Sequence, residues 1–219
     1  MNLILLGAPG TGKGTLADGI RTATGVAHIS TGDLFRANIK EGTPLGLEAS
    51  AYISKGELVP DTLTIAMLED RLTRDDCRNG FLLDGYPRTI AQADALAAFL
   101  TRKGLRLDGV LNVRLADQTI QDRLSGRRVC PSCGRSYNLQ AMPPKTEGVC
   151  DACGAALEHR NDDRPETIAV RLKAYHDKTR PLVEYYTKQG MLHDFDNEVG
   201  SKTTLQRILK LLETLGEAE

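Results

Sequence analysis

The sequence predicts an α/β fold, in which a parallel β-sheet is covered by helices and interrupted by two insertions. Short apolar runs alternate with longer segments of helical periodicity along most of the 219 residues, and this alternation is typical of strands joined by crossover helices. A glycine-rich segment, residues 7–15, lies between the first apolar run and the first helical segment. Four of the five cysteines fall within residues 130–153, where the alternation stops.

The predicted strands are short apolar runs that end at glycine or at a polar residue. Leu3–Leu6 ends at Gly7, and Phe81–Leu83 is followed at once by Asp84. Near-continuous apolar runs are typical of parallel strands that are buried on both faces. The candidate strands are residues 3–6, 28–29, 81–83, 110–113 and 192–195, of which the second and the last carry the weaker pattern.

The predicted helices lie between these runs. Leu205, Ile208, Leu209 and Leu212 form an apolar stripe in the last segment, which predicts a helix with one buried face. The other helical segments are residues 13–24, 61–74, 89–103 and 117–125.

A longer helix is expected to begin near Pro165, because proline is favoured in the first helical turn. Asp162 and Asp163 precede it, and we expect their carboxylates to cap its free N–H groups. Pro181 should kink or break the same helix, because proline removes a backbone donor and clashes with the preceding turn.

Two segments are expected to be insertions on the α/β core. Residues 30–59 are helical in pattern and hold no obvious strand, whereas residues 126–163 hold the cysteines, two adjacent prolines and several glycines. The expected core therefore consists of residues 1–29, 60–125 and 164–219.

The glycine-rich segment reads G-x-x-x-x-G-K between a strand and a helix, which is the context of a phosphate-binding loop. Its backbone N–H groups can turn inward around phosphate oxygens, and the helix N-terminus adds partial positive charge. Lys13 is expected to reach the β- and γ-phosphates of a nucleotide. The loop residues expected to contact that nucleotide are Gly10, Thr11, Gly12, Lys13, Gly14 and Thr15.

One position departs from the general loop pattern. Gly14 stands where such loops usually have serine or threonine, and Thr15 comes one residue later. We therefore expect Mg²⁺ to be held by the phosphates, water and Asp84 instead of by a direct ligand from the loop.

The cysteines are spaced as C-x2-C-x16-C-x2-C, formed by Cys130, Cys133, Cys150 and Cys153. This spacing is typical of a zinc site. Four thiolates complete a tetrahedral shell and leave no open position, which indicates a structural metal; iron suits the same donor set. Cys77 stands apart and is expected to be a small core residue.

Composition argues against some other functions. The formal net charge is -1, the sequence pI is about 6.4, and 5% of residues are aromatic, so the basic surface and stacking platforms of nucleic-acid-binding proteins are not expected. No apolar run approaches the length that crosses a bilayer, and the first residues lack the features of a signal peptide. We therefore expect a cytoplasmic protein that does not bind membranes.

Several motifs make the chain resemble the nucleoside monophosphate kinases. The loop ends in G-K-G-T as in that family, and S-T-G-D-L at residues 30–34, followed by Arg36, resembles its acceptor-binding segment. D-G-Y-P-R at residues 84–88, with Gln92 after it, is similar to a signature of the adenylate kinases. G-R-R at residues 126–128 and R-x-D-D at residues 160–163 resemble the ends of their lid. The resemblance covers nearly the whole chain.

The resemblance implies a five-stranded parallel core with two mobile parts: an arm of residues 30–59 that binds the acceptor, and a zinc-containing lid of residues 126–163. It implies reversible transfer of the γ-phosphoryl group from Mg-ATP to AMP, which gives two ADP. Adenylate kinase lids are a well-known case of closure that excludes water, so that phosphate is not lost to hydrolysis. A monomer is the simplest expectation.

The resemblance also implies roles for individual residues. Phosphoryl transfer needs alignment and positive charge around the transferred group, and the planar fork of arginine binds phosphate at two points. The expected catalytic residues are Lys13, Asp84, Arg88, Arg123, Arg160 and Arg171. Outside the loop, those expected at ATP are Arg123, Arg127, Ser136 and Tyr137. Those expected at AMP are Thr31, Arg36, Glu57, Leu58, Val59, Gly85, Tyr86, Pro87, Arg88, Gln92, Arg160 and Arg171. Among these, Thr31 and Gln92 are expected to read the adenine.

Two alternatives remain at this point. A sister kinase acting on UMP, CMP or GMP would use the same chemistry with a different acceptor pocket, and the donor preference between ATP and GTP is open. A zinc-ribbon protein on a P-loop scaffold, which binds nucleic acid or another protein, would explain the cysteines without the kinase motifs.

Overall fold

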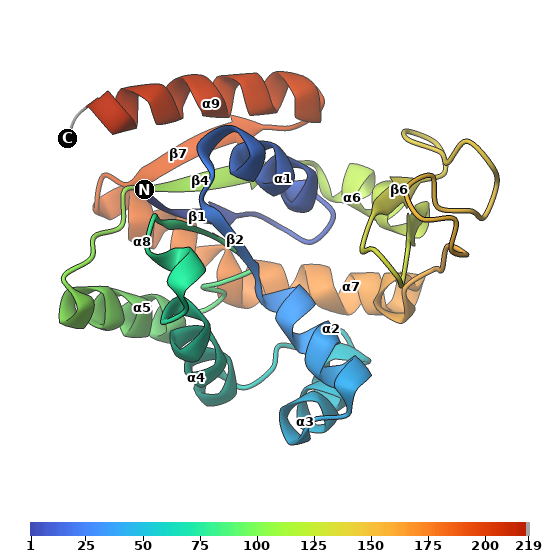
Figure 1. Ribbon diagram of the computed structural model, residues 1–219, viewed down its shortest axis with the longest axis horizontal. Coiled ribbons are helices and arrows are strands. Elements are labelled where there is room, and N and C mark those ends of the chain that lie inside the picture. The colour runs from blue at the N-terminus through green and yellow to red at the C-terminus, as the bar shows by residue number, and fades with distance from the viewer. Residues whose placement is uncertain (218–219) are drawn as a thin grey trace.

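A computed structural model describes residues 1–217 and contains the predicted parallel sheet. Its five strands run in the order β2-β3-β1-β4-β7, and all neighbours are parallel (Figure 1). The strands are β1 (Asn2–Leu6), β2 (Ala27–Ser30), β3 (Phe81–Asp84), β4 (Gly109–Arg114) and β7 (Leu192–Asp196). The five predicted runs, including the two weaker ones, are therefore confirmed as strands.

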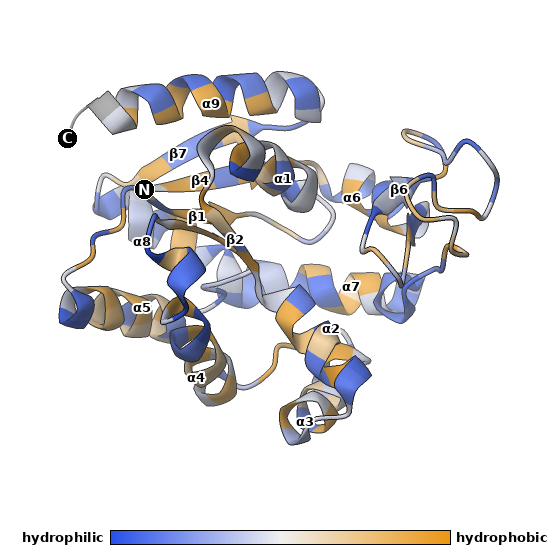
Figure 2. Ribbon diagram, in the orientation of Figure 1, coloured by the Kyte–Doolittle hydropathy of each residue, from blue (hydrophilic) through white to orange (hydrophobic). Residues whose placement is uncertain are grey.

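The sheet lies between two layers of helices. Helices α1 (Lys13–Thr24) and α9 (Ser201–Glu217) cover one face, whereas α4 (Asp61–Leu72), α5 (Ile90–Lys103) and α8 (Pro181–Lys188) lie on the other (Figure 1). Apolar residues concentrate on the strands and on the inward sides of these helices (Figure 2). The predicted stripe of the last helix is confirmed, since all four of its leucine and isoleucine side chains belong to the α1–α9 layer.

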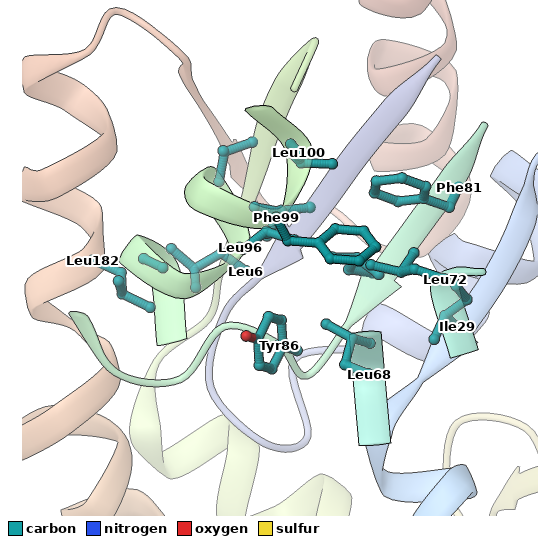
Figure 3. Packing of buried hydrophobic residues seen from close by; sticks show 14 of the residues in the cluster. Leu6, Ile29, Leu68, Leu72, Phe81, Tyr86, Leu96, Phe99, Leu100 and Leu182 are labelled. Carbon is teal, nitrogen blue, oxygen red and sulfur yellow. The ribbon is translucent and has the colours of Figure 1, made fainter. Parts of the chain in front are cut away.

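Alternation along β1 explains why its apolar run is continuous. Leu3 and Leu5 pack with α1 and α9, while Ile4 and Leu6 pack with the opposite layer, as side chains of a strand alternate between faces. The opposite layer also contains aromatic side chains, and Figure 3 shows the ring of Tyr86 among Leu6, Leu68 and Phe99. Each fully buried leucine or isoleucine contributes about 1.5–3 kcal/mol by leaving water.

The segment after β2 is helical, as its pattern predicts. It contains α2 (Thr31–Glu41) and α3 (Pro44–Ile53), and each begins at a hydroxyl that accepts a backbone N–H bond. Ser30 accepts from Asp33, and Thr43 accepts from Gly46; such caps satisfy donors that the first helical turn leaves free. A separate small cluster around Phe35 and Ala49 holds these helices together.

The cysteine segment follows α6 (Asp117–Ser125) and projects to one side of the molecule (Figure 1). Its regular structure is an antiparallel pair, β5 (Arg127–Val129) and β6 (Ser136–Asn138). The apolar cluster of this segment is small and consists of Cys130, Tyr137 and Cys150 with Ala155 and Leu157 against them. So few apolar groups offset little of the entropy lost on ordering the segment.

The predicted cap of the Pro165 helix is wrong. Helix α7 (Pro165–Ala174) begins after Arg164 without a side-chain cap. Asp162 and Asp163 instead lie in a 3-10 turn and bind arginines described below. The predicted break at Pro181 is confirmed, since a π turn (Tyr175–Thr179) separates α7 from α8, which begins at this proline.

Two further expectations concern burial and length. Cys77 is buried against the core as predicted. Within the described part of the chain, none of the helices is long and apolar enough to cross a membrane.

Candidate active site

The phosphate loop connects β1 to α1 and is packed closely from behind. Gly7, Gly10 and Gly12 have φ values of 145°, 84° and 94°, a region that favours glycine. A Cβ on Gly7 would lie 2.4 Å from the carbonyl oxygen of Val113, and one on Gly10 would lie 2.8 Å from the side chain of Leu124. A side chain at Gly7 would therefore collide with β4, and one at Gly10 would collide with α6, so the loop fits only with glycine at these positions.

Lys13 lies at the centre of a cluster of charges. Its Nζ donates to the carbonyl oxygens of Gly7 and Ala8 at 2.8 and 2.7 Å. Burial lowers the pKa of Lys13 from 10.5 to about 8; the carboxylate of Asp84 opposes this shift, and the charges of Arg88, Arg171 and Arg127 add to it. Three arginines from separate parts of the chain are thus close enough to lower the pKa of this one ammonium group.

Asp84 ends β3 and lies beside the end of β2, where Ser30 is its register partner. Its Oδ2 is 3.6 Å from Nε2 of His28. The carboxylate is largely buried yet belongs to the charge cluster around Lys13. A hard oxygen ligand at this point suits Mg²⁺, either directly or through water.

The segment after β3 brings Thr31 and Arg88 together. Thr31 Oγ1 donates to the carbonyl oxygen of Gly85 at 2.8 Å, and Arg88 Nε donates to the same oxygen at 2.8 Å. The φ of Gly85 is 78°, and a Cβ there would lie 2.9 Å from Thr31 Oγ1. Tyr86 and Pro87 are buried and joined by a cis peptide bond.

Burial, and then the charge of Arg171, lower the pKa of Arg88 to about 10. Arg36 also acts on Arg88 and is paired with Asp33 on its own helix. These two arginines, both predicted at the acceptor phosphate, therefore lie in one electrostatic cluster.

Gln92 is buried, and both ends of its amide group have protein partners. Nε2 donates to Oδ1 of Asp61 at 2.7 Å, and Oε1 accepts from the backbone N–H of Arg88 at 2.8 Å. A surface position is thereby excluded. Its expected role at the adenine stays a prediction, since an incoming base would have to exchange with these partners.

Asp163 joins the base of the cysteine segment to α7. Its carboxylate is fully buried and accepts from Arg127 Nε and Nη2 at 2.7 and 2.6 Å and from Arg171 Nη1 at 2.9 Å. Arg160 lies in the same field: burial, followed by the charges of Arg36 and Arg127, lowers its pKa to about 10. Nε of Arg160 is buried and has no hydrogen-bond partner among residues 1–217.

The remaining predicted residues lie in different surroundings. A Cβ on Gly12 would lie 3.9 Å from Arg123 Nη1, which places this guanidinium beside the loop. Ser136 is exposed on β6, whereas the Tyr137 side chain is buried inside the cysteine segment. Glu57 is exposed, Leu58 half-buried and Val59 buried.

Residues 57–59 follow a close contact with α7. A Cβ on Gly56 would lie 2.9 Å from the carbonyl oxygen of Thr167 and 3.1 Å from Cγ of Arg171. The end of the helical arm is therefore held next to the arginine cluster.

Asn197, which lies between β7 and α9, is a site residue that the sequence motifs do not predict. This side chain is fully buried, and its Nδ2 donates to the carbonyl oxygen of Thr11 at 2.6 Å. Its backbone N–H donates to the carbonyl oxygen of Arg114 at the end of β4. The available signal was its position just after the predicted strand at residues 192–195, because loops at the carboxyl ends of parallel strands meet at the ligand site.

The four clustered cysteines form one group. Their sulfur atoms all lie within 4.8 Å of one another, with 3.4 Å between Cys130 and Cys153 and 3.5 Å between Cys133 and Cys150. Tetrahedral zinc with Zn–S distances of about 2.3 Å requires sulfur separations of about 3.8 Å. The donor set therefore fits one tetrahedral ion with small adjustments.

Comparison with known proteins identifies close relatives. The family model described as "Adenylate kinase" matches residues 5–191. Proteins named adenylate kinase from Caldicellulosiruptor saccharolyticus and Clostridium beijerinckii are each 50% identical to the chain over 212 residues, covering 97% of the chain and 99% and 98% of those proteins. The protein of that name from Carboxydothermus hydrogenoformans is 53% identical over 196 residues, which is 90% of the chain and 92% of that protein.

Proposed function

Since the chain belongs to the adenylate kinase family, we propose that it transfers the γ-phosphoryl group of Mg-ATP reversibly to AMP and gives two ADP. The observation that carries this proposal is the charge cluster around Lys13 of the phosphate loop, in which the positive charges of Arg88, Arg127 and Arg171 act on its ammonium group. Transfer of a phosphoryl group depends mainly on such positioned positive charge.

On the donor side, we propose that the backbone N–H groups of residues 10–15 and the ammonium of Lys13 hold the ATP phosphates. Arg123 lies beside this loop, and Arg127 is the first residue of β5 in the proposed lid. Asn197 holds the carbonyl of Thr11 and so keeps the loop amides oriented toward the phosphates.

On the acceptor side, we propose that Arg36 and Arg88 bind the AMP phosphate, and that the segment after β3 together with Thr31 and Gln92 receives the base. The remaining residues proposed for this pocket are Glu57, Leu58, Val59, Gly85, Tyr86 and Pro87. Arg160 and Arg171 would lie between the two phosphate chains, where the charge of the transferred group develops.

The acceptor oxygen attacks the γ-phosphorus as the bond to the β-phosphate oxygen breaks, so both leaving and entering oxygens need neutralisation. Magnesium bound to the ATP phosphates supplies part of that positive charge, and Asp84 is the protein residue proposed to hold it through water. The arginines supply the rest and fix the line of transfer.

We propose that residues 30–59 and 126–163 act as an acceptor-binding arm and a lid on a core of residues 1–29, 60–125 and 164–219. Closure of the lid would exclude water from the reacting phosphates. Zinc is proposed as the ion held by Cys130, Cys133, Cys150 and Cys153, where it would supply the structural core that the few apolar lid residues do not.

We further propose a monomer that works in the cytoplasm and whose partners are ATP, AMP and ADP, without nucleic acid or membrane. The acidic balance of the chain and its few aromatic residues support the absence of nucleic acid.

An acceptor panel tests the proposed reaction. Purified protein, ATP and Mg²⁺ are mixed separately with AMP, UMP, CMP and GMP, and ³¹P NMR follows the diphosphates that form. ADP formation with AMP alone supports the proposal. A preference for another monophosphate would retain the fold and the phosphate clamp but overturn the assignment of the base pocket.

A further inference from the structure

Tyr137 faces the cysteine cluster, although the sequence predicts it at ATP. The residue lies on β6, and its side chain belongs to the small apolar cluster of the lid with Cys130 and Cys150. It is 4% exposed, and these two cysteines are each 2% exposed. An aromatic hydroxyl in such a place normally has a hydrogen-bond partner.

Two of the groups around the hydroxyl of Tyr137 define the direction of its hydrogen bonds. The backbone N–H of Asp151 donates to Oη at 2.8 Å, which occupies a lone pair of the oxygen. The sulfur of Cys150 lies 3.5 Å from the same Oη. A metal-bound cysteine is a thiolate without a proton, so the O–H of Tyr137 is the donor in that contact.

We propose that Tyr137 is a positioning residue of the metal site, and that its hydroxyl donates to the Cys150 thiolate and fixes the direction in which that sulfur meets the ion. This inference rests on the zinc site proposed above. Hydrogen-bonded groups just outside a metal's ligands commonly orient those ligands and tune their donor strength.

The charge of the site supports this role. Four thiolates around Zn²⁺ carry a net charge of about -2, which nearby donors must disperse. Cys130 receives the backbone N–H of Cys133 at 3.5 Å, as Cys150 receives the hydroxyl.

The test uses full-length protein with Tyr137→Phe, which keeps the ring and removes only the hydroxyl. Zinc affinity is measured by competition with a chromophoric chelator, and the cobalt-substituted protein reports thiolate-to-metal charge transfer in the near ultraviolet. Tyr175→Phe is the matched control, because this tyrosine lies in the π turn outside the lid.

Loss of the hydroxyl is expected to weaken zinc binding by about 10- to 100-fold and to move the cobalt charge-transfer band to longer wavelength, because a thiolate without its donor is more easily oxidised. The control variant should match wild type in both measurements. Weaker binding with an unmoved band would indicate a packing effect only and overturn the inference, as would unchanged affinity. Failure of the wild-type protein to take up either metal would instead overturn the zinc site itself, and the inference with it.

Discussion

Binding of ATP should be coupled to proton uptake at Lys13. Burial and the neighbouring arginines hold the pKa of Lys13 at about 8, down from 10.5. Nucleotide phosphates next to Nζ add negative charge that favours the ammonium form. The pKa of this group is therefore expected to rise when ATP binds, and the complex then holds more protons than the separate partners.

The size of the uptake follows from the pKa of about 8. The free amine fraction is about one tenth at pH 7, one half at pH 8 and nine tenths at pH 9, so these are the upper limits of proton uptake per site. The sign is such that ATP affinity decreases as pH rises above about 8. The decrease approaches tenfold per pH unit until the pKa of the bound state is reached.

Isothermal titration calorimetry in buffers of different ionisation enthalpy measures this uptake directly. The zinc-loaded protein is compared with Lys13→Met, which has no titrating group at this position, so protons exchanged by ATP and by other residues cancel in the difference. At pH 8 the wild type should take up about half a proton more than the variant. An equal uptake in both proteins, or a difference that does not grow from pH 7 to pH 9, would refute the reasoning.

Three further predictions concern other parts of the site. Arg88→Ala should lower kcat/KM with AMP by about 10²-fold or more in a coupled assay, and a loss confined to the KM for ATP would contradict its placement at the acceptor. Cys130→Ser should lower both the zinc content, measured by atomic absorption, and the Tm of the lid, because three thiolates close the shell less tightly; full zinc retention would contradict a four-cysteine site. Asn197→Ala should cost about 1–3 kcal/mol in urea unfolding, because the buried carbonyl of Thr11 loses its donor. It should raise the KM for ATP more than that for AMP, and an equal rise in both would argue against a loop-specific effect.

The fold was largely predictable because its strongest signals are local. The run Leu3–Leu6 and the glycine loop after it define one strand, one turn and one helix within a short stretch. Even the weak run at residues 28–29 lies in β2, where Ile29 is buried in the same apolar cluster as Leu68 and Leu72 of α4. The error at the start of α7 has a physical cause: Asp162 and Asp163 are good caps by residue type, but the buried arginines nearby bind them more strongly.

The site was less predictable wherever a partner is distant in the chain. Nothing in the sequence pattern around Gln92 indicates that its side-chain amide will donate a hydrogen bond to Asp61. Asn197, after β7, reaches Thr11 in the loop after β1, 186 residues earlier in the chain, and no sequence periodicity predicts such a contact. Tyr137 shows a related limit, because β6 directs its side chain toward the cysteines and only the three-dimensional arrangement reveals this.

The bond between Arg127 and Asp163 joins the two ends of the proposed lid. This bond holds together the points at which the chain leaves and re-enters the core. The residues between them therefore form a closed loop, and a change within this loop has little effect on the sheet. A loop of this kind can change in length at a modest entropic cost, since the entropy of loop closure depends only weakly on loop length. The metal chemistry of the proposed lid can in this sense vary without changing the sheet that carries the phosphate loop.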